Sequence, residues 1–291
     1  VDGQLVGLVP KQQLAGDGLH YEPRWFAAWP QGVVKEYLTE RGPIPFGELL
    51  LDVGGLRIGF EICEDAWQGD RPGLRLYRQG VDVLLSPSAS HFARGKSAIR
   101  RQLVAESSRA FHCIYAYANL LGNEAGRIIY DGELLAAQNG RLLAAAERLS
   151  LKEVDLLTVD VDPNLHRTAR RKVYGYRQQS RQQDSRLEHS LHIPFEWKAV
   201  QPAQPDTTEA ELIAQQPTPE KEIYLAATLG LWDYARKTRS KGFVLSLSGG
   251  ADSSMCAVLS AHAWKRAQQE LTTNELPPLK DWLCCIYQGT E

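Results

Sequence analysis

The segment FVLSLSGGADSSMCAVLSA, residues 243–261, decides how the C-terminal part of the chain folds. A mostly apolar run at 243–247 leads into a cluster of serine, glycine and aspartate, and then into a helical pattern. This order predicts a strand, a tight turn and a helix. A strand-to-helix turn needs only one or two small or polar residues, so the seven in SGGADSS require another explanation.

The turn at 248–254 would present unpaired backbone N–H groups at the positive end of a helix, an arrangement that favours an anion. Gly249 and Gly250 let the backbone approach a ligand closely. Because the carboxylate of Asp252 would repel phosphate, its presence suggests a bound Mg²⁺ ion. The hydroxyl donors expected at the same site are those of Ser248, Ser253 and Ser254. The alternative is a simple capped turn, with Ser248 or Asp252 as the N-cap.

This loop lacks the GK[ST] ending of a Walker A loop but resembles the SGGxDS loop of the ATP pyrophosphatase superfamily. The resemblance implies ATP and Mg²⁺ as substrate and metal, with no prosthetic group. It further implies that ATP is cleaved between its α- and β-phosphates, that AMP passes to an oxygen of the second substrate, and that the loop holds the pyrophosphate. The implied fold is a doubly wound parallel α/β domain of the adenine nucleotide α-hydrolase type.

The rest of the chain is predicted to divide into three regions. Residues 1–197 alternate short β-rich runs with helical stretches, which favours a layered α/β domain. Residues 198–217 are rich in proline, glutamine and threonine and are typical of a linker. A helix then begins with Thr218 as N-cap and Pro219 in its first turn, so 218–291 is expected to be the beginning of a second domain.

Within the first region, one helix is expected at 97–112, and a hairpin is expected at Gly54 and Gly55. The candidate strands are 5–10, 48–53, 56–62, 81–87, 113–119, 126–132 and 155–162.

The segment RIGFEICEDAW, residues 57–67, places Cys63 where a strand ends and a new element begins. A nucleophile on such a turn is exposed, and the following backbone N–H can bind an oxyanion. Cysteine needs a base or a nearby cation to react near neutral pH, and Lys11 at the end of LVGLVPK could supply positive charge. The alternative is an inert, buried cysteine at the end of a strand.

The first region resembles the nitrilase superfamily, which implies an α-β-β-α sandwich and a Glu–Lys–Cys catalytic triad. By this resemblance Cys63 is the nucleophile, Lys11 is the family lysine, and Glu22 in YEPRWF is a second glutamate that orients the lysine. The backbone amide of Glu64 would bind the oxyanion, and Ser88 would line the substrate pocket. The general-base glutamate is expected on a strand before Val1.

Composition limits the other functions. The net charge of −2 gives no global field for nucleic acid or acidic membrane, and no apolar run is long enough for a membrane span. Five irregularly spaced cysteines argue against a disulfide framework, so a reducing cytoplasm is expected and the four other than Cys63 are predicted to lie in the core. The basic segment 166–186 could bind RNA by stacking, but a solvated loop or an interdomain contact is the preferred interpretation.

A nitrilase-like unit followed by an SGGxDS unit is similar to the glutamine-dependent NAD⁺ synthetases. The resemblance implies that glutamine, deamido-NAD⁺ and ATP are the substrates, that ammonia passes from the first unit to the second, and that the enzyme is a homo-oligomer. Two alternatives remain open. One is a stand-alone amidase with a vestigial extension, and the other is a non-catalytic scaffold with a nitrilase-like fold.

Overall fold

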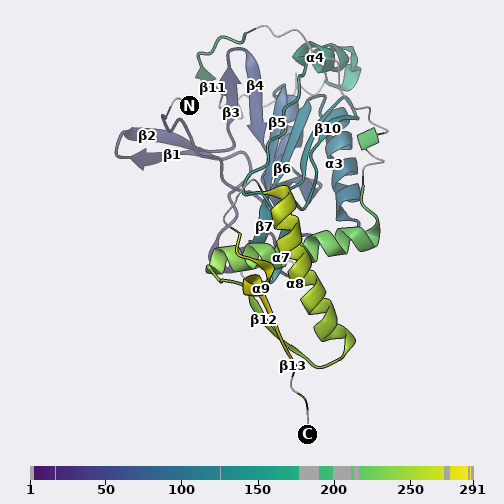
Figure 1. Ribbon diagram of the computed structural model, residues 1–291. Coiled ribbons are helices and arrows are strands. Elements are labelled where there is room, and N and C mark those ends of the chain that lie inside the picture. The colour runs from purple at the N-terminus through teal and green to yellow at the C-terminus, as the bar shows by residue number, and fades with distance from the viewer. Residues whose placement is uncertain are drawn as a thin grey trace.

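The computed structural model describes residues 3–16, 18–124, 126–176, 190–198, 211–212, 216–271, 276–287 and 289. Its largest element is a seven-stranded sheet in the order β10-β9-β6-β5-β4-β3-β11, seen in the upper half of Figure 1. These strands are β3 (Leu50–Val53), β4 (Leu56–Phe60), β5 (Val83–Ser88), β6 (Ile114–Asn119), β9 (Leu134–Gln138), β10 (Arg141–Ala145) and β11 (Ser190–Ile193).

The centre of this sheet is parallel because helices connect its strands. Helix α2 (Pro72–Arg78) lies between β4 and β5, and α3 (Lys96–Ala110) lies between β5 and β6. Helix α3 packs against β6, β9 and β10, and the side chains between the layers are fully buried, among them Leu84 and Tyr115. A parallel pair needs such a crossover, so the 97–112 helix predicted from the sequence is confirmed as α3.

Tight turns join two antiparallel pairs of this sheet, β3 with β4 and β9 with β10. Gly54 and Gly55 adopt positive φ between β3 and β4, which confirms the predicted hairpin. Asn139 and Gly140 do the same between β9 and β10, where Asn-Gly is a strong hairpin signal that our sequence prediction missed. Two further hairpins were not predicted, β1 (Val34–Thr39) with β2 (Gly42–Gly47) and β7 (Leu121–Glu124) with β8 (Ile128–Asp131).

Two predicted strands are wrong. At 5–10 only Leu8 forms an isolated bridge, to Phe46. The segment 155–162 alternates apolar and polar residues as a strand would, but it has no strand assignment and Leu156 is 84% exposed. Alternation alone does not make a strand unless a neighbouring strand pairs with it, and none among the described residues does.

The C-terminal unit begins with α7 (Pro219–Thr238), whose N-cap Thr218 accepts the backbone N–H of Lys221 at 3.4 Å, as predicted. It continues through β12 (Phe243–Leu247), α8 (Ala251–Glu270), the short α9 (Leu279–Trp282) and β13 (Leu283–Tyr287). Because β12 and β13 pair in parallel across α8, this segment is a βαβ unit, as expected at the start of a doubly wound domain. None of the described helices is long and apolar enough to cross a bilayer.

Helices α7 and α8 pack on each other and on the N-terminal unit. Leu149 and Leu151, which follow β10, share a buried cluster with residues of α7, α8 and α9. In Figure 1 the C-terminal end of α8 lies next to the large sheet, and β12 and β13 point away from it. Most of the predicted linker, 199–210 and 213–215, lies outside the described residues.

Two other predictions need correction or refinement. Cys113 is buried as expected, but Cys256, Cys284 and Cys285 are exposed, because no described residues cover those faces of α8 and β13.

The basic segment 166–186 includes most of helix α4 (Pro163–Lys172), which is bonded to the N-terminal unit. Arg167 Nε donates to Oδ1 of the buried Asp82 at 2.9 Å. Residues 177–186 of that segment lie outside the described part of the chain.

Candidate active site

Cys63 lies at a sharp turn immediately after β4. It is the first residue of a short 3₁₀ helix, Cys63–Trp67, and its backbone has a φ of 50°. A non-glycine residue in this left-handed region is uncommon and is often found at functional turns. The predicted strand-to-helix elbow is therefore present, with the thiol half-buried.

Asp65 holds the elbow against the segment that carries Lys11. Its Oδ1 atom accepts the backbone N–H groups of Gln12 at 3.1 Å and Gln13 at 2.7 Å, and its Oδ2 atom accepts the N–H of Ile62 at 3.0 Å. Asp65 is almost fully buried, so these bonds are shielded from water. One carboxylate therefore fixes two chain segments that are about 50 residues apart in sequence, a role that the sequence did not reveal.

Lys11 and Glu22 form an ion pair through Lys11 Nζ and Glu22 Oε2. The same carboxylate oxygen accepts the backbone N–H of Ala15 at 2.7 Å, which fixes Glu22 where α1 (Glu22–Trp25) begins. The Lys11 side chain is only 15% exposed, so it cannot move freely into solvent. This is the geometry expected of a glutamate that orients the lysine.

Charged groups from three segments surround the thiol. Burial raises the pKa of Cys63 above its ordinary 9.0, the N–H of Ala89 and the Lys11 ammonium lower that pKa in part, and Glu22 and Glu64 raise it again. The group is therefore a protonated thiol at neutral pH, and it needs a base to become a nucleophile. A thiol beside a fixed ammonium can attack a carbonyl carbon, because the ammonium stabilises the oxyanion that develops.

The two other residues predicted for this site occupy its edges. Glu64 directly follows the nucleophile, and its side chain accepts a hydrogen bond from Gln68 Nε2 at 2.6 Å. Ser88 ends β5 in register with Asn119, whereas the backbone group that lowers the pKa of the thiol belongs to the next residue, Ala89.

Tyr130 is a neighbour of the site that sequence reasoning missed. Its hydroxyl donates to Glu124 Oε2 at 2.6 Å. Burial, then Glu124, and then Cys63 and Glu22 raise the pKa of Tyr130, which places its ring beside the thiol and its partners. In the sequence Tyr130 belongs only to a β-rich run, and nothing local distinguishes it from a core aromatic.

The second candidate site is the loop before α8. Gly250 is the N-cap of this helix and makes no side-chain capping bond, so the capped-turn interpretation with Ser248 or Asp252 as N-cap is not the arrangement found. Gly249 has a φ of 80°, and no atom would lie within 4 Å of a Cβ there, so open space faces this part of the backbone. Asp252 is exposed.

The serine hydroxyls of this loop bond mainly to the loop itself. Ser253 Oγ lies 3.2 Å from Ser248 Oγ and 3.2 Å from the carbonyl oxygen of Gly250, and Ser254 Oγ donates to the same carbonyl at 2.9 Å. These contacts are exposed, so a ligand could replace them at little cost. No group of three or more metal-ligating side chains occurs among the described residues, and Asp252 is the carboxylate within the 248–254 segment.

The two candidate sites lie in different units. Figure 1 shows the N-terminal end of α8, where the serine loop is, on the side remote from the seven-stranded sheet, whereas the opposite end of α8 contacts the N-terminal unit. That contact includes Arg266 Nη2 donating to the Leu149 carbonyl at 2.8 Å.

Comparison with known proteins agrees with this division. Residues 4–171 match the family profile described as "Carbon-nitrogen hydrolase", and residues 223–277 match the one described as "NAD synthase". The chain is 31% identical over 274 residues to a "Glutamine-dependent NAD(+) synthetase" of Oryza sativa subsp. indica, a match that covers 89% of this chain and 36% of that protein. The corresponding protein of Saccharomyces cerevisiae is 31% identical over 271 residues, with 89% and 38% covered.

Solved structures show the same similarity. A glutamine-dependent NAD(+) synthetase from Cytophaga hutchinsonii superposes with a TM-score of 0.69 at 38% identity, covering 97% of this chain and 42% of that one. A second, from Acinetobacter baumannii and solved with adenosine diphosphate, shares the fold, with a TM-score of 0.57 at 22% identity and coverage of 95% and 39%. The predicted mixed α/β fold with a nitrilase-like unit is confirmed. The chain spans less than half the length of each of these relatives.

Proposed function

The chain belongs to the carbon-nitrogen hydrolase family, and on that premise we propose that it carries the amidase unit and the beginning of the synthetase unit of a glutamine-dependent NAD⁺ synthetase. The observation that supports this most directly is the combination of two sites in one chain. A thiol beside a fixed lysine–glutamate pair lies in the first unit, and a serine–glycine loop at a helix N-terminus lies in the second.

In the amidase unit, Cys63 attacks the carboxamide carbon of glutamine. The carbon–nitrogen bond breaks, ammonia leaves with the thiol's proton, and a thioester to Cys63 remains, which water hydrolyses to glutamate and free thiol. Lys11 and the backbone N–H of Glu64 stabilise the oxyanion of each tetrahedral intermediate, while Glu22 and Asp65 keep Lys11 in place. A general base must take the thiol proton, and the family resemblance implies that this base is a glutamate.

In the synthetase unit, ATP adenylates the carboxylate of deamido-NAD⁺, pyrophosphate departs, and ammonia displaces AMP to give the amide. The loop of Ser248, Gly249, Gly250, Ser253 and Ser254 binds the pyrophosphate through its backbone N–H groups and hydroxyls. Mg²⁺ usually takes one or two protein carboxylates and completes its shell with phosphate oxygens and water, so the exposed carboxylate of Asp252 fits such an ion when ATP is bound. A cytoplasmic location and assembly into a homo-oligomer belong to the same proposal.

The test separates the two units through the nitrogen source. In the complete enzyme, Cys63→Ala should abolish NAD⁺ formation from glutamine but preserve its formation from added ammonium salts. The matched control is Cys256→Ala, which removes an exposed thiol of α8 and should preserve both reactions.

Loss of both reactions in Cys63→Ala, with Cys256→Ala normal, would contradict the division into two sites. Retention of glutamine-driven synthesis would remove Cys63 from the amidase site. A protein that hydrolyses amides but releases no pyrophosphate from ATP would instead support the stand-alone amidase.

A further inference from the structure

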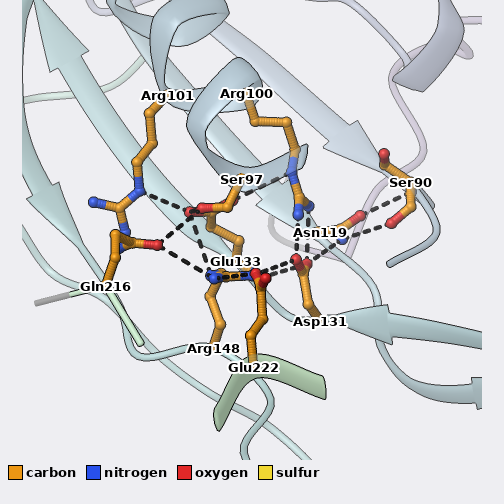
Figure 2. A network of polar contacts seen from close by, with 10 residues as sticks. All are labelled: Ser90, Ser97, Arg100, Arg101, Asn119, Asp131, Glu133, Arg148, Gln216 and Glu222. Atoms are coloured by element: carbon orange, nitrogen blue, oxygen red, sulfur yellow. Dashed lines mark hydrogen bonds and ion pairs between the residues drawn. The ribbon is translucent and has the colours of Figure 1, made fainter. Parts of the chain in front are cut away.

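A buried network of charged and polar side chains joins the amidase unit to helix α7 (Figure 2). Its amidase members come from α3, from the ends of β6 and β8 and from the segments after β5 and β10. Glu222 lies in the first turn of α7, and Gln216 lies just before that helix. The residues drawn are Ser90, Ser97, Arg100, Arg101, Asn119, Asp131, Glu133, Arg148, Gln216 and Glu222.

Among the residues that the structure describes, the charges of this network balance when Glu222 of α7 is included. The amidase unit contributes three guanidinium groups and two carboxylates to it, and Glu222 supplies a third carboxylate, with Arg148 Nη2 2.7 Å from Glu222 Oε1. Because an uncompensated buried charge is strongly destabilising, the pair fixes α7 relative to the amidase unit. The amidase members are Arg100, Arg101, Arg148, Asp131 and Glu133.

The contact with α7 continues inward through Asp131. Arg148 Nη1 donates to Asp131 Oδ2 at 3.3 Å, while Arg100 Nη1 and Asn119 Nδ2 donate to Asp131 Oδ1 at 2.8 and 2.7 Å. Asp131 and Arg100 have no exposed surface, so water does not replace these bonds. Arg100 donates to both oxygens of the Asp131 carboxylate and is its main partner, while Arg148 adds a longer bond to Oδ2. The carboxylate in turn holds the Asn119 amide, so Arg148 is one of the groups that set its position.

Asn119 then fixes the backbone next to the thiol. Its Oδ1 atom accepts the N–H of Ser90 at 2.9 Å, and its Nδ2 atom donates to the carbonyl oxygen of Ser90 at 2.9 Å. The preceding residue is Ala89, whose backbone lies close enough to Cys63 to lower the pKa of the thiol. A shift of the Asn119 amide would move the 89–90 backbone relative to the thiol.

We propose that Glu222 is a positioning residue for the amidase site, acting through Arg148, Asp131 and Asn119 on the backbone that contacts Cys63. The amidase site is then fully formed only while the first turn of the synthetase unit is docked. The inference rests on the proposed function only for naming Cys63 as the nucleophile.

The experiment compares Glu222→Gln with Glu220→Gln in the complete protein. Both changes remove one negative charge from the first turn of α7, but Glu220 is exposed and Glu222 is buried. Iodoacetamide, a small neutral reagent, alkylates the protein across the pH range around 9.0, the ordinary pKa of a thiol, and mass spectrometry follows the peptide that contains Cys63. Temperatures well below the unfolding midpoint keep both variants folded.

The expected result is slower alkylation in Glu222→Gln near neutral pH, by about two- to thirtyfold, with a higher apparent pKa of Cys63. The other charged or titratable groups near this thiol are Lys11, Glu22, Glu64 and Tyr130, and neither variant changes them. A purely through-space effect of removing a negative charge would lower the pKa of the thiol, which is the opposite sign. An unchanged or lowered pKa in Glu222→Gln, or an equal change in Glu220→Gln, overturns the proposal.

A double-mutant cycle tests the route. If the effect passes through Asn119, then Glu222→Gln should change the alkylation rate little in an Asn119→Ala background, whereas independent effects would multiply and contradict the route. Alkylation needs no glutamine, so the result stands even if the substrate is another amide. Failure of the nitrogen-source test with a positive alkylation result would refute the proposed function and leave the coupling intact.

Discussion

The surroundings of Cys63 and the loop at 248–254 satisfy their polar groups in opposite ways. At the thiol, one buried carboxylate, Asp65, accepts three backbone N–H groups from two segments, and Lys11 is paired with Glu22. At the loop, exposed serine hydroxyls bond to each other and to the Gly250 carbonyl.

This difference predicts how each site should respond to amino-acid substitutions. The thiol site is preorganised, because long-range contacts already hold its groups where a transition state would need them. The loop keeps its donors in exchangeable local bonds, so a ligand can take them over without disturbing the fold. Substitutions at the thiol site should therefore lower the rate of amide chemistry, whereas substitutions in the loop should affect only the ligand of the second unit.

The largest effect is expected from Lys11→Met. Loss of one oxyanion donor costs about 3–4 kcal/mol in the transition state, so glutamine hydrolysis should fall by roughly two to three orders of magnitude. The measurement is glutamate release by the complete enzyme, with Lys35→Met as control because Lys35 is an exposed lysine of strand β1. A Lys11→Met rate within a few-fold of the unmodified enzyme would mean that the thiol site is not preorganised around this lysine.

A smaller effect, confined to the second unit, is expected from Asp252→Asn. The change should lower pyrophosphate release from ATP with deamido-NAD⁺ by about ten- to a hundredfold at limiting Mg²⁺, because the loop loses its metal-binding carboxylate. Glutamine hydrolysis and the unfolding midpoint should stay the same, since the side chain is exposed and no side chain caps this helix. The control is Asp281→Asn, an exposed aspartate of α9.

Unchanged pyrophosphate release and an unchanged Mg²⁺ dependence in Asp252→Asn would remove Asp252 from the second site. A large drop in its unfolding midpoint would show instead that the loop is structural, and the contrast between the two regions would disappear.

The smallest expected effect is a loss of folding stability at low pH, when Asp131 becomes protonated. Burial alone would raise the pKa of Asp131, but the bonds from Arg100 outweigh it and hold this pKa below the ordinary 3.8. A lowered folded-state pKa contributes stability above about 3.8 that is lost as the pH falls through the lower, folded-state value. Acidification in that window should therefore loosen the buried network.

The unfolding midpoint should fall in this window by roughly 2–4 °C for each kcal/mol lost. Hydrogen exchange should become faster around the Asp131 network and in the first turn of α7 before it changes in the second half of α8. A midpoint that does not depend on pH below 3.8 would contradict the stabilising role of the Asp131 carboxylate.

Local signals in the sequence determined the elements that depend only on near neighbours in the chain. The structure has a helix cap at Thr218, a tight turn at 248–250 and an elbow at Cys63, the positions that the sequence predicted. Such features are set by a few consecutive residues, so local sequence is enough to locate them. The Asn139-Gly140 hairpin belongs to the same class, since its signal is in the sequence and was overlooked. The family resemblance, rather than any local pattern, led to the pairing of Lys11 with Glu22.

Tertiary structure alone decided which charged residues are buried and with which partners. Asp65, Asp131 and Arg148 look like ordinary surface residues in the sequence, and each is buried with partners that include groups 53, 17 and 74 residues away, respectively. The strand-like alternation at 155–162 failed for the converse reason, because no described strand pairs with it. A buried charge or a strand is stable only when its distant partner is in place, and that distance is fixed by the fold and not by the order of residues.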